Sequence, residues 1–214
     1  SWKDFQARNN NELGAIFGNF VNRTLVLTHK YFNGEVPEQN ALEKEDIAVL
    51  NVLKQTPLTV EKAIRSFRFR DAQAEAMKLA RTGNKYLADT EPWKQIKTNP
   101  DRVKTILNIS LQITANLAVV FEPFMPHIST KLASMLGIEL PKWDAAGNSA
   151  LILSGHCINK PEILFAKIED ELIDAQLEKL KNTTSNQSKF PPMKDEITFD
   201  EFTKLDIRVA TITA

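Results

Sequence analysis

Few residues in this 214-residue chain could make or break a chemical bond. The three histidines, His29, His127 and His156, lack the spacing at which two of them share a helix face and bind a metal. The acids of Glu169–Glu171 are consecutive, so their carboxylates diverge around a helix instead of forming an acid–base pair. None of the seven glycines builds a phosphate-binding loop. We therefore expect no catalytic residue, no metal site and no cofactor site.

Two segments instead combine aromatic rings with cations, which is typical of nucleic-acid-binding surfaces. Arginine and phenylalanine alternate over most of Arg65–Arg70, and Trp93 follows Pro92 and precedes Lys94 and Lys97. Aromatic faces stack on bases, while cations bind phosphates. Each segment also fits a structural role, since arginines can cover buried phenylalanines and Trp93 can belong to a core. Composition alone leaves both interpretations open.

The composition is that of a soluble globular protein without bulk attraction to nucleic acid or membrane. Basic and acidic residues both number 27, although a local basic groove is compatible with zero net charge. The longest uncharged stretch, 105–121, is interrupted by five polar residues from Asn108 to Asn116, so we expect no membrane span. The single cysteine, Cys157, excludes an internal disulfide, and no targeting segment is evident. These features predict a cytoplasmic protein.

Apolar spacing and capping residues predict mostly helices. The expected helices span 13–33, about 41–55, 59–67, 71–87, 100–121 and 126–137, followed by a helical stretch from Lys160–Glu162 that contains Ile168, Leu172, Leu177 and Leu180. Pro57 is expected to interrupt or kink the second of them. The stretch 107–117 alternates like a strand, but the cap at Asn99–Pro100 and its helical neighbours favour a helix.

The remaining segments lack the apolar spacing of a helix. Turn residues between 140 and 158 predict an irregular flap or a small hairpin. The polar stretch 182–189 is typical of a linker. Residues 205–212 alternate like an amphipathic strand, and one strand cannot bury its own face. We expect this end of the sequence to be the truncated start of a second domain without stability of its own.

Short motifs in a fixed order carry a resemblance to a known family. They are Asn10–Gly14, Gly18–Thr24, Asn84–Leu87, Glu91–Lys94 and Phe121–Pro126, then Trp143–Asp144, Gly155–His156 and Asn159–Pro161. In this order they resemble the anticodon-binding domain of methionyl-tRNA synthetase and the segment that follows it. Ile197–Val209 resembles the opening of the tRNA-binding OB-fold module that is appended to many bacterial members.

The resemblance implies an all-α protein with four parts. These are a helix bundle of the class I synthetase anticodon-binding type over 1–138, a flap and connecting helix over 139–181, a linker over 182–196, and a truncated OB-fold start over 197–214. It implies recognition of the CAU anticodon of tRNA(Met) for methionylation by a parent catalytic domain outside this chain. ATP and zinc would belong to that domain, so the fragment alone should be inactive. The full-length enzyme would be a homodimer through its complete OB-fold domain.

The resemblance also assigns the candidate anticodon-binding residues. In the family a tryptophan that follows a proline stacks on an anticodon base, and Pro92 and Trp93 match this pair. Readers on the first helix recur at steps of four, where Asn22 and Lys30 supply the first and last. Val26 stands at the middle position in place of an asparagine, and His29 is the candidate to replace it.

A rival interpretation is a helical scaffold for protein–protein docking, with Trp93 and the phenylalanines as buried anchors. Salt dependence distinguishes the two functions, because phosphate contacts release counterions and apolar docking does not.

Overall fold

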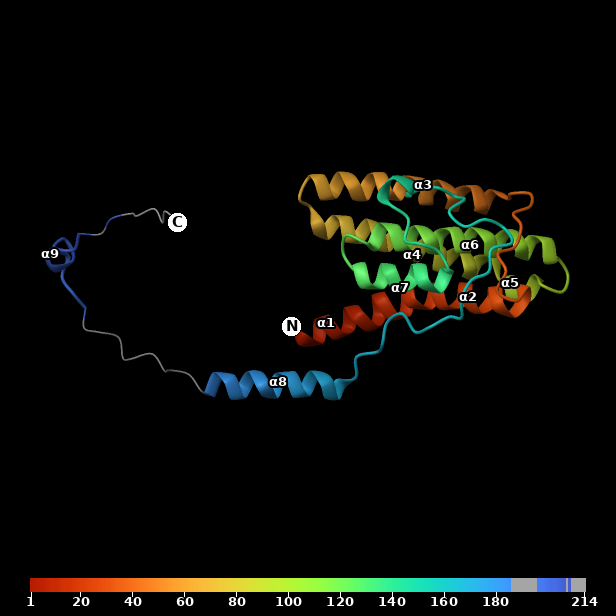
Figure 1. The fold of residues 1–214 in the computed structure, drawn as a ribbon. Coiled ribbons are helices and arrows are strands. Elements are labelled where there is room, and N and C mark those ends of the chain that lie inside the picture. The colour runs from red at the N-terminus through yellow and green to blue at the C-terminus, as the bar shows by residue number, and fades with distance from the viewer. Residues whose placement is uncertain (186–195, 207, 209–214) are drawn as a thin grey trace. The chain divides into compact units, whose positions relative to one another are not determined.

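The computed structural model describes residues 1–185, 196–206 and 208, and all regular secondary structure in this part of the chain is helical (Figure 1). The elements are α1 (Trp2–Arg8), the π-helix η1 (Asn9–Gly18), α2 (Asn19–Phe32), α3 (Lys44–Arg65), α4 (Phe69–Thr90), α5 (Pro92–Gln95), α6 (Pro100–Phe121), α7 (Pro126–Leu136), the 3-10 turn η2 (Trp143–Ala145), α8 (Asp170–Ser185) and α9 (Phe199–Phe202). The all-α prediction is confirmed. The chain divides into two compact units, residues 1–173 and residues 174–214.

The first helical segment is longer than its apolar pattern predicts. α1, η1 and α2 follow one another without a break from Trp2 to Phe32, so the helix begins eleven residues before the predicted start at Leu13. Its end is as predicted, because Asn33 and Gly34 both adopt positive φ angles, 52° and 81°. A left-handed residue at this position closes the helix.

The prediction that Pro57 would interrupt a helix is wrong. α3 continues through Pro57, although proline offers no N–H to the carbonyl of Leu53. Pro57 is buried, and the neighbouring Thr56 hydroxyl donates to the Val52 carbonyl at 2.8 Å. Tertiary packing thus outweighs the local preference, and the predicted helices 41–55 and 59–67 form one element.

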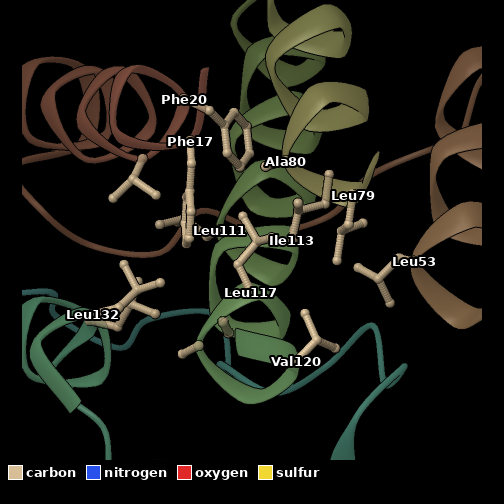
Figure 2. Close-up of a cluster of buried hydrophobic side chains, with 14 of the residues drawn as sticks. Phe17, Phe20, Leu53, Leu79, Ala80, Leu111, Ile113, Leu117, Val120 and Leu132 are labelled. Carbon is tan, nitrogen blue, oxygen red and sulfur yellow. The ribbon is translucent and has the colours of Figure 1, made fainter. Parts of the chain in front are cut away.

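The core lies between α6 and the helices around it (Figure 2). Phe17 and Phe20 from the first segment approach Leu111 of α6, and all three side chains are fully buried. α6 contacts α2, α3, α4, α5 and α7, so it is the central helix of the described bundle. By length and composition it is the one helix in the described part that could cross a bilayer, but 94% of that apolar window is buried inside the bundle.

Two sets of buried polar residues, each repeating at every fourth position of α6, together explain its strand-like pattern. Ser110 and Thr114 donate to carbonyls within the helix, and the amides of the other set reach backbone outside it. Asn108 donates to the Pro37 carbonyl at 2.7 Å. Gln112 exchanges two hydrogen bonds with the backbone of Ile152, and Asn116 binds the backbone of Gly147 and Asn148. These amides satisfy irregular backbone that would otherwise be buried without partners. The helical interpretation of 107–117 is confirmed, and the buried amides of Gln112 and Asn116 hold the flap.

The segment after α7 is irregular, as one alternative predicted, and no hairpin forms there. The only β-bridge in the described residues pairs Glu35 with Cys157. The helix predicted from Lys160 begins later, at Asp170, so α8 contains Leu172, Leu177 and Leu180 as predicted but not Ile168. Ile168 is instead outside any helix or strand, and its N–H and carbonyl bond the Asn10 side chain at 2.9 Å each.

The C-terminal predictions are mostly beyond the described residues. α8 continues to Ser185, past the predicted linker start at 182, and residues 186–195 of that linker are not described. α9 is capped by Thr198 and Glu201, which exchange hydrogen bonds in a capping box. The predicted strand 205–212 lies outside the described residues except for Leu205, Asp206 and Arg208. The predicted domain limits stay predictions.

Candidate nucleic-acid interface

Trp93 lies on a short turn between two long helices. α4 ends at Thr90, and Glu91 takes a left-handed conformation (φ 42°, ψ 56°) that reverses the chain. Pro92, with its fixed φ, then starts the four-residue helix α5. The Gln95 side chain donates to the Thr90 carbonyl at 2.5 Å and closes the turn. These local preferences present the indole beyond the end of α4.

Trp93 is half-buried and contacts the first helical segment. The Arg23 guanidinium of α2 lies over its ring, 4.7 Å from the ring centroid. This distance is that of a cation–π contact. Trp93 also lies outside the hydrophobic core cluster of the described residues, whereas Trp143 packs against it. Trp93 is therefore partly exposed and lies beside the first helical segment.

α2 presents one exposed polar stripe toward solvent. Asn19, Asn22, Val26 and Lys30 are all exposed and follow one another at steps of three or four, which places them on one helix face. Asn22 is next to Arg23 in the sequence. Lys30 is seven residues after Arg23, which is about 10 Å along the helix axis, so it is at the far end of this stripe. The predicted readers Asn22 and Lys30 thus share a surface, and their role in binding stays a prediction.

His29 is held by the protein itself. Its Nε2 is 2.9 Å from the Asn159 carbonyl oxygen. Its ring also packs over Gly34, where an added Cβ would be 2.6 Å from His29 Cε1. His156 behaves similarly, with Nε2 at 2.8 Å from the Leu136 carbonyl oxygen. His29 therefore ties the end of α2 to the flap, and its assignment as an anticodon contact stays a prediction.

The sequence interpretation did not single out Arg23 and Asn19. Asn19 Nδ2 donates to Asn84 Oδ1 at 3.3 Å and so links α2 to α4. The two helices approach closely at this point because Gly83 has no side chain, and a Cβ there would be 2.6 Å from the Phe20 ring. Both missed residues belong to the motif Gly18–Thr24, and their i, i+4 spacing was a signal that could have found them.

The charges around Trp93 are mainly cationic. Lys94 is paired with Glu91 at 2.8 Å. Arg23, Lys30 and Lys97 have no ion-pair partner among the residues the structure describes. Cations without a carboxylate partner are available to phosphates.

The second aromatic and cationic segment lies at the other end of α4. Phe67 and Phe69 are 81% and 55% exposed, so the interpretation of arginines covering buried phenylalanines is wrong. Arg65 pairs with Glu61 at 2.7 Å and Arg68 with Asp71 at 3.5 Å. Trp93 is separated from this turn by the whole of α4, about 33 Å for its 22 residues.

Phe67 is also strained, which gives a testable expectation. Its φ of 57° is in the left-handed region, where a side chain costs free energy that glycine does not. Because the ring is exposed, Phe67→Gly should stabilise the protein by about 1 kcal/mol in urea unfolding. Phe69→Gly is the control, since Phe69 begins α4 with ordinary helical geometry and its replacement should not stabilise. A loss of stability in Phe67→Gly would contradict the assignment of strain.

No group of three or more histidine, cysteine, aspartate or glutamate residues in the described ranges could hold a metal ion.

Comparison with known families settles which family contains this bundle. A family model described as the anticodon binding domain of methionyl tRNA ligase matches residues 36–185. The chain belongs to this family. The matched range includes Trp93 but begins after α2. The curated relatives described next match nearly the whole chain, so their similarity includes α2.

Methionine–tRNA ligase of Phocaeicola vulgatus is 57% identical over 99% of this chain and 32% of its own length. The enzyme of the same name from Porphyromonas gingivalis is 54% identical over the same shares. The chain therefore spans about a third of the curated methionine–tRNA ligases that it matches. The fold also resembles apo methionyl-tRNA synthetase of Mycobacterium tuberculosis, with a TM-score of 0.72 at 21% identity over 79% of this chain and 35% of that one.

Proposed function

We propose that this chain recognises the CAU anticodon of tRNA(Met) for a parent methionine–tRNA ligase. The observation that carries the proposal is Trp93, half-buried outside the core with the Arg23 guanidinium over its ring. Bases of a single-stranded loop lose their stacking when splayed out, so a protein must supply an aromatic face and specific donors and acceptors. Trp93 supplies the face.

The stripe on α2 supplies the polar groups. Asn19 and Asn22 carry amides that both donate and accept, as the recognition of base edges requires. The planar guanidinium of Arg23 can stack or form two parallel hydrogen bonds. Lys30, at the far end of the same stripe, and Lys97, four residues after Trp93, would contact phosphates.

The proposal extends to the parent protein. Methionine activation with ATP, and any zinc site, would belong to the part of the ligase outside these residues, and this chain would contribute the positioning of tRNA. The full-length enzyme would be a cytoplasmic homodimer through its complete OB-fold domain.

A stem-loop titration tests the proposal. The chain should bind a CAU stem-loop in preference to one with an altered anticodon, by about 5- to 150-fold for each base whose hydrogen bonds are lost. If Arg23, Lys30 and Lys97 contact phosphates, the logarithm of affinity should fall with the logarithm of salt with a slope of about −2.

Equal affinity for all anticodons, or no affinity at low salt, would contradict anticodon recognition. Binding that is weak for RNA but strong and salt-insensitive for a protein partner would favour the docking scaffold.

A further inference from the structure

A fully buried carboxylate lies in the first turn of α3. Asp46 accepts hydrogen bonds from four donors: the Glu43 N–H at 2.9 Å, the Tyr86 hydroxyl at 2.6 Å, and Arg102 Nη1 and Nη2 at 2.5 and 2.9 Å. The Arg102 side chain is only 7% exposed and also pairs with Glu43. Such a network has few alternative geometries, because each buried polar group needs its partner.

Two of these donors flank the segment that carries Trp93. Tyr86 is in the last turn of α4, and its carbonyl accepts from the Thr90 hydroxyl at 2.6 Å. Thr90 in turn accepts from Gln95 of α5. Arg102 is the third residue of α6, and its N–H is capped by the Asn99 side chain at 3.2 Å. One carboxylate of α3 thus fixes both ends of the connection between α4 and α6.

The connection has little that could hold its own shape. α5 is four residues long, which is too short to be a stable helix by itself. Glu91 adopts a left-handed conformation that is unfavourable for a residue with a side chain. The direction of the Trp93 ring therefore depends on how the ends of α4 and α6 are held.

We propose that Asp46 is a positioning residue for Trp93, acting through Tyr86 and Arg102 to set where the indole lies relative to Arg23. The positioning of Trp93 does not depend on the proposed function; only its expected effect on RNA binding rests on that function. Positioning matters there because a displacement of about 1 Å in a contact group can lower function by 100-fold.

Fluorescence tests the positioning without RNA. The chain has three tryptophans, so replacing Trp2 and Trp143 by phenylalanine leaves Trp93 as the sole indole. In this background Tyr86→Phe removes one donor to Asp46 and keeps the ring. We expect Trp93 to become more accessible to acrylamide and its emission to shift to the red, at a temperature where circular dichroism shows a folded protein.

Gln112→Met is the matched control. Gln112 is a buried amide of α6 whose bonds reach the flap, and it is ten residues or about 15 Å along the helix from Arg102. This variant should lose stability without changing the quenching of Trp93. Unchanged quenching in Tyr86→Phe, or equal changes in both variants, would overturn the positioning role.

Stem-loop binding separates this inference from the proposed function. Tyr86→Phe should weaken CAU stem-loop binding by roughly 5- to 10-fold when Trp93 is present, and should have no effect in a Trp93→Ala background. An equal effect in both backgrounds would overturn the inference. If the wild type binds no stem-loop while quenching responds as expected, the proposed function is wrong and the positioning of Trp93 by Asp46 stands.

Discussion

Trp93→Ala is expected to lower the affinity for a CAU stem-loop by roughly 5- to 150-fold, because stacking of one base on an aromatic ring contributes about 1–3 kcal/mol. Stability should change much less. Truncating a tryptophan inside a core costs about 3–5 kcal/mol, but Trp93 is half-buried and outside the core cluster. Denaturant unfolding and stem-loop titration on the same preparation measure both quantities.

Trp143→Ala provides the opposite pattern as a control. Trp143 belongs to the flap and packs against the core, so its loss should reduce stability while the folded protein keeps its affinity for the stem-loop. If Trp93→Ala instead unfolded the bundle and left binding by the folded fraction unchanged, Trp93 would be a core residue and its assignment as a stacking platform would be wrong.

Arg102→Met should cause the largest loss of stability, about 3–5 kcal/mol, because it leaves the buried Asp46 carboxylate without its cation. Methionine keeps much of the volume of the arginine stem, so the loss reports mainly the missing charge and hydrogen bonds. Lys104→Met on the same helix is the matched control. Lys104 pairs with Asp101 at 2.8 Å at the surface, and its replacement should leave the unfolding midpoint nearly unchanged.

The pH dependence gives a second measurement on the same variant. Burial raises the pKa of Asp46, but the hydrogen bonds from Arg102, Tyr86 and the Glu43 N–H outweigh it and hold the pKa below its ordinary value of 3.8. The unfolded chain therefore takes up a proton near pH 3.8 that the folded chain does not. This contribution to stability is present above that pH and is lost as the pH falls through the folded pKa.

Without Arg102, Asp46 keeps only the pKa-lowering hydrogen bonds from Tyr86 and the Glu43 N–H against its burial. Its pKa should therefore be higher in the variant than in wild type, and acid should destabilise the variant less. The difference in unfolding free energy between wild type and Arg102→Met should therefore narrow as the pH falls below about 4. If the difference in unfolding free energy instead stayed the same from about pH 7 to about pH 3, Arg102 would act by packing and not by charge.

The amino-acid sequence by itself determined the helix ends that depend on local chemistry. Asn33–Gly34 and Gly137 close helices in the left-handed conformation, and Asn99 caps α6, as their residue types predict. The order of the short motifs along the sequence also indicated the anticodon-binding family. Pro92 and Trp93 could be named as a pair because they match the proline and the stacking tryptophan of that family. These signals depend on a few adjacent residues, and the tertiary structure leaves these helix ends where the local chemistry places them.

Only the tertiary structure decided the features that join distant segments. Pro57 stays inside α3 because burial outweighs a missing hydrogen bond, and Ile168 leaves the helical path because its backbone bonds Asn10. Arg23 could not be assigned to Trp93 from a spacing of 70 residues, and the donors that Tyr86 and Arg102 bring to Asp46 of α3 come from two other helices, α4 and α6. Contacts of this kind have no local pattern, because the free energy that selects them comes from packing and desolvation of groups that meet only in the folded chain.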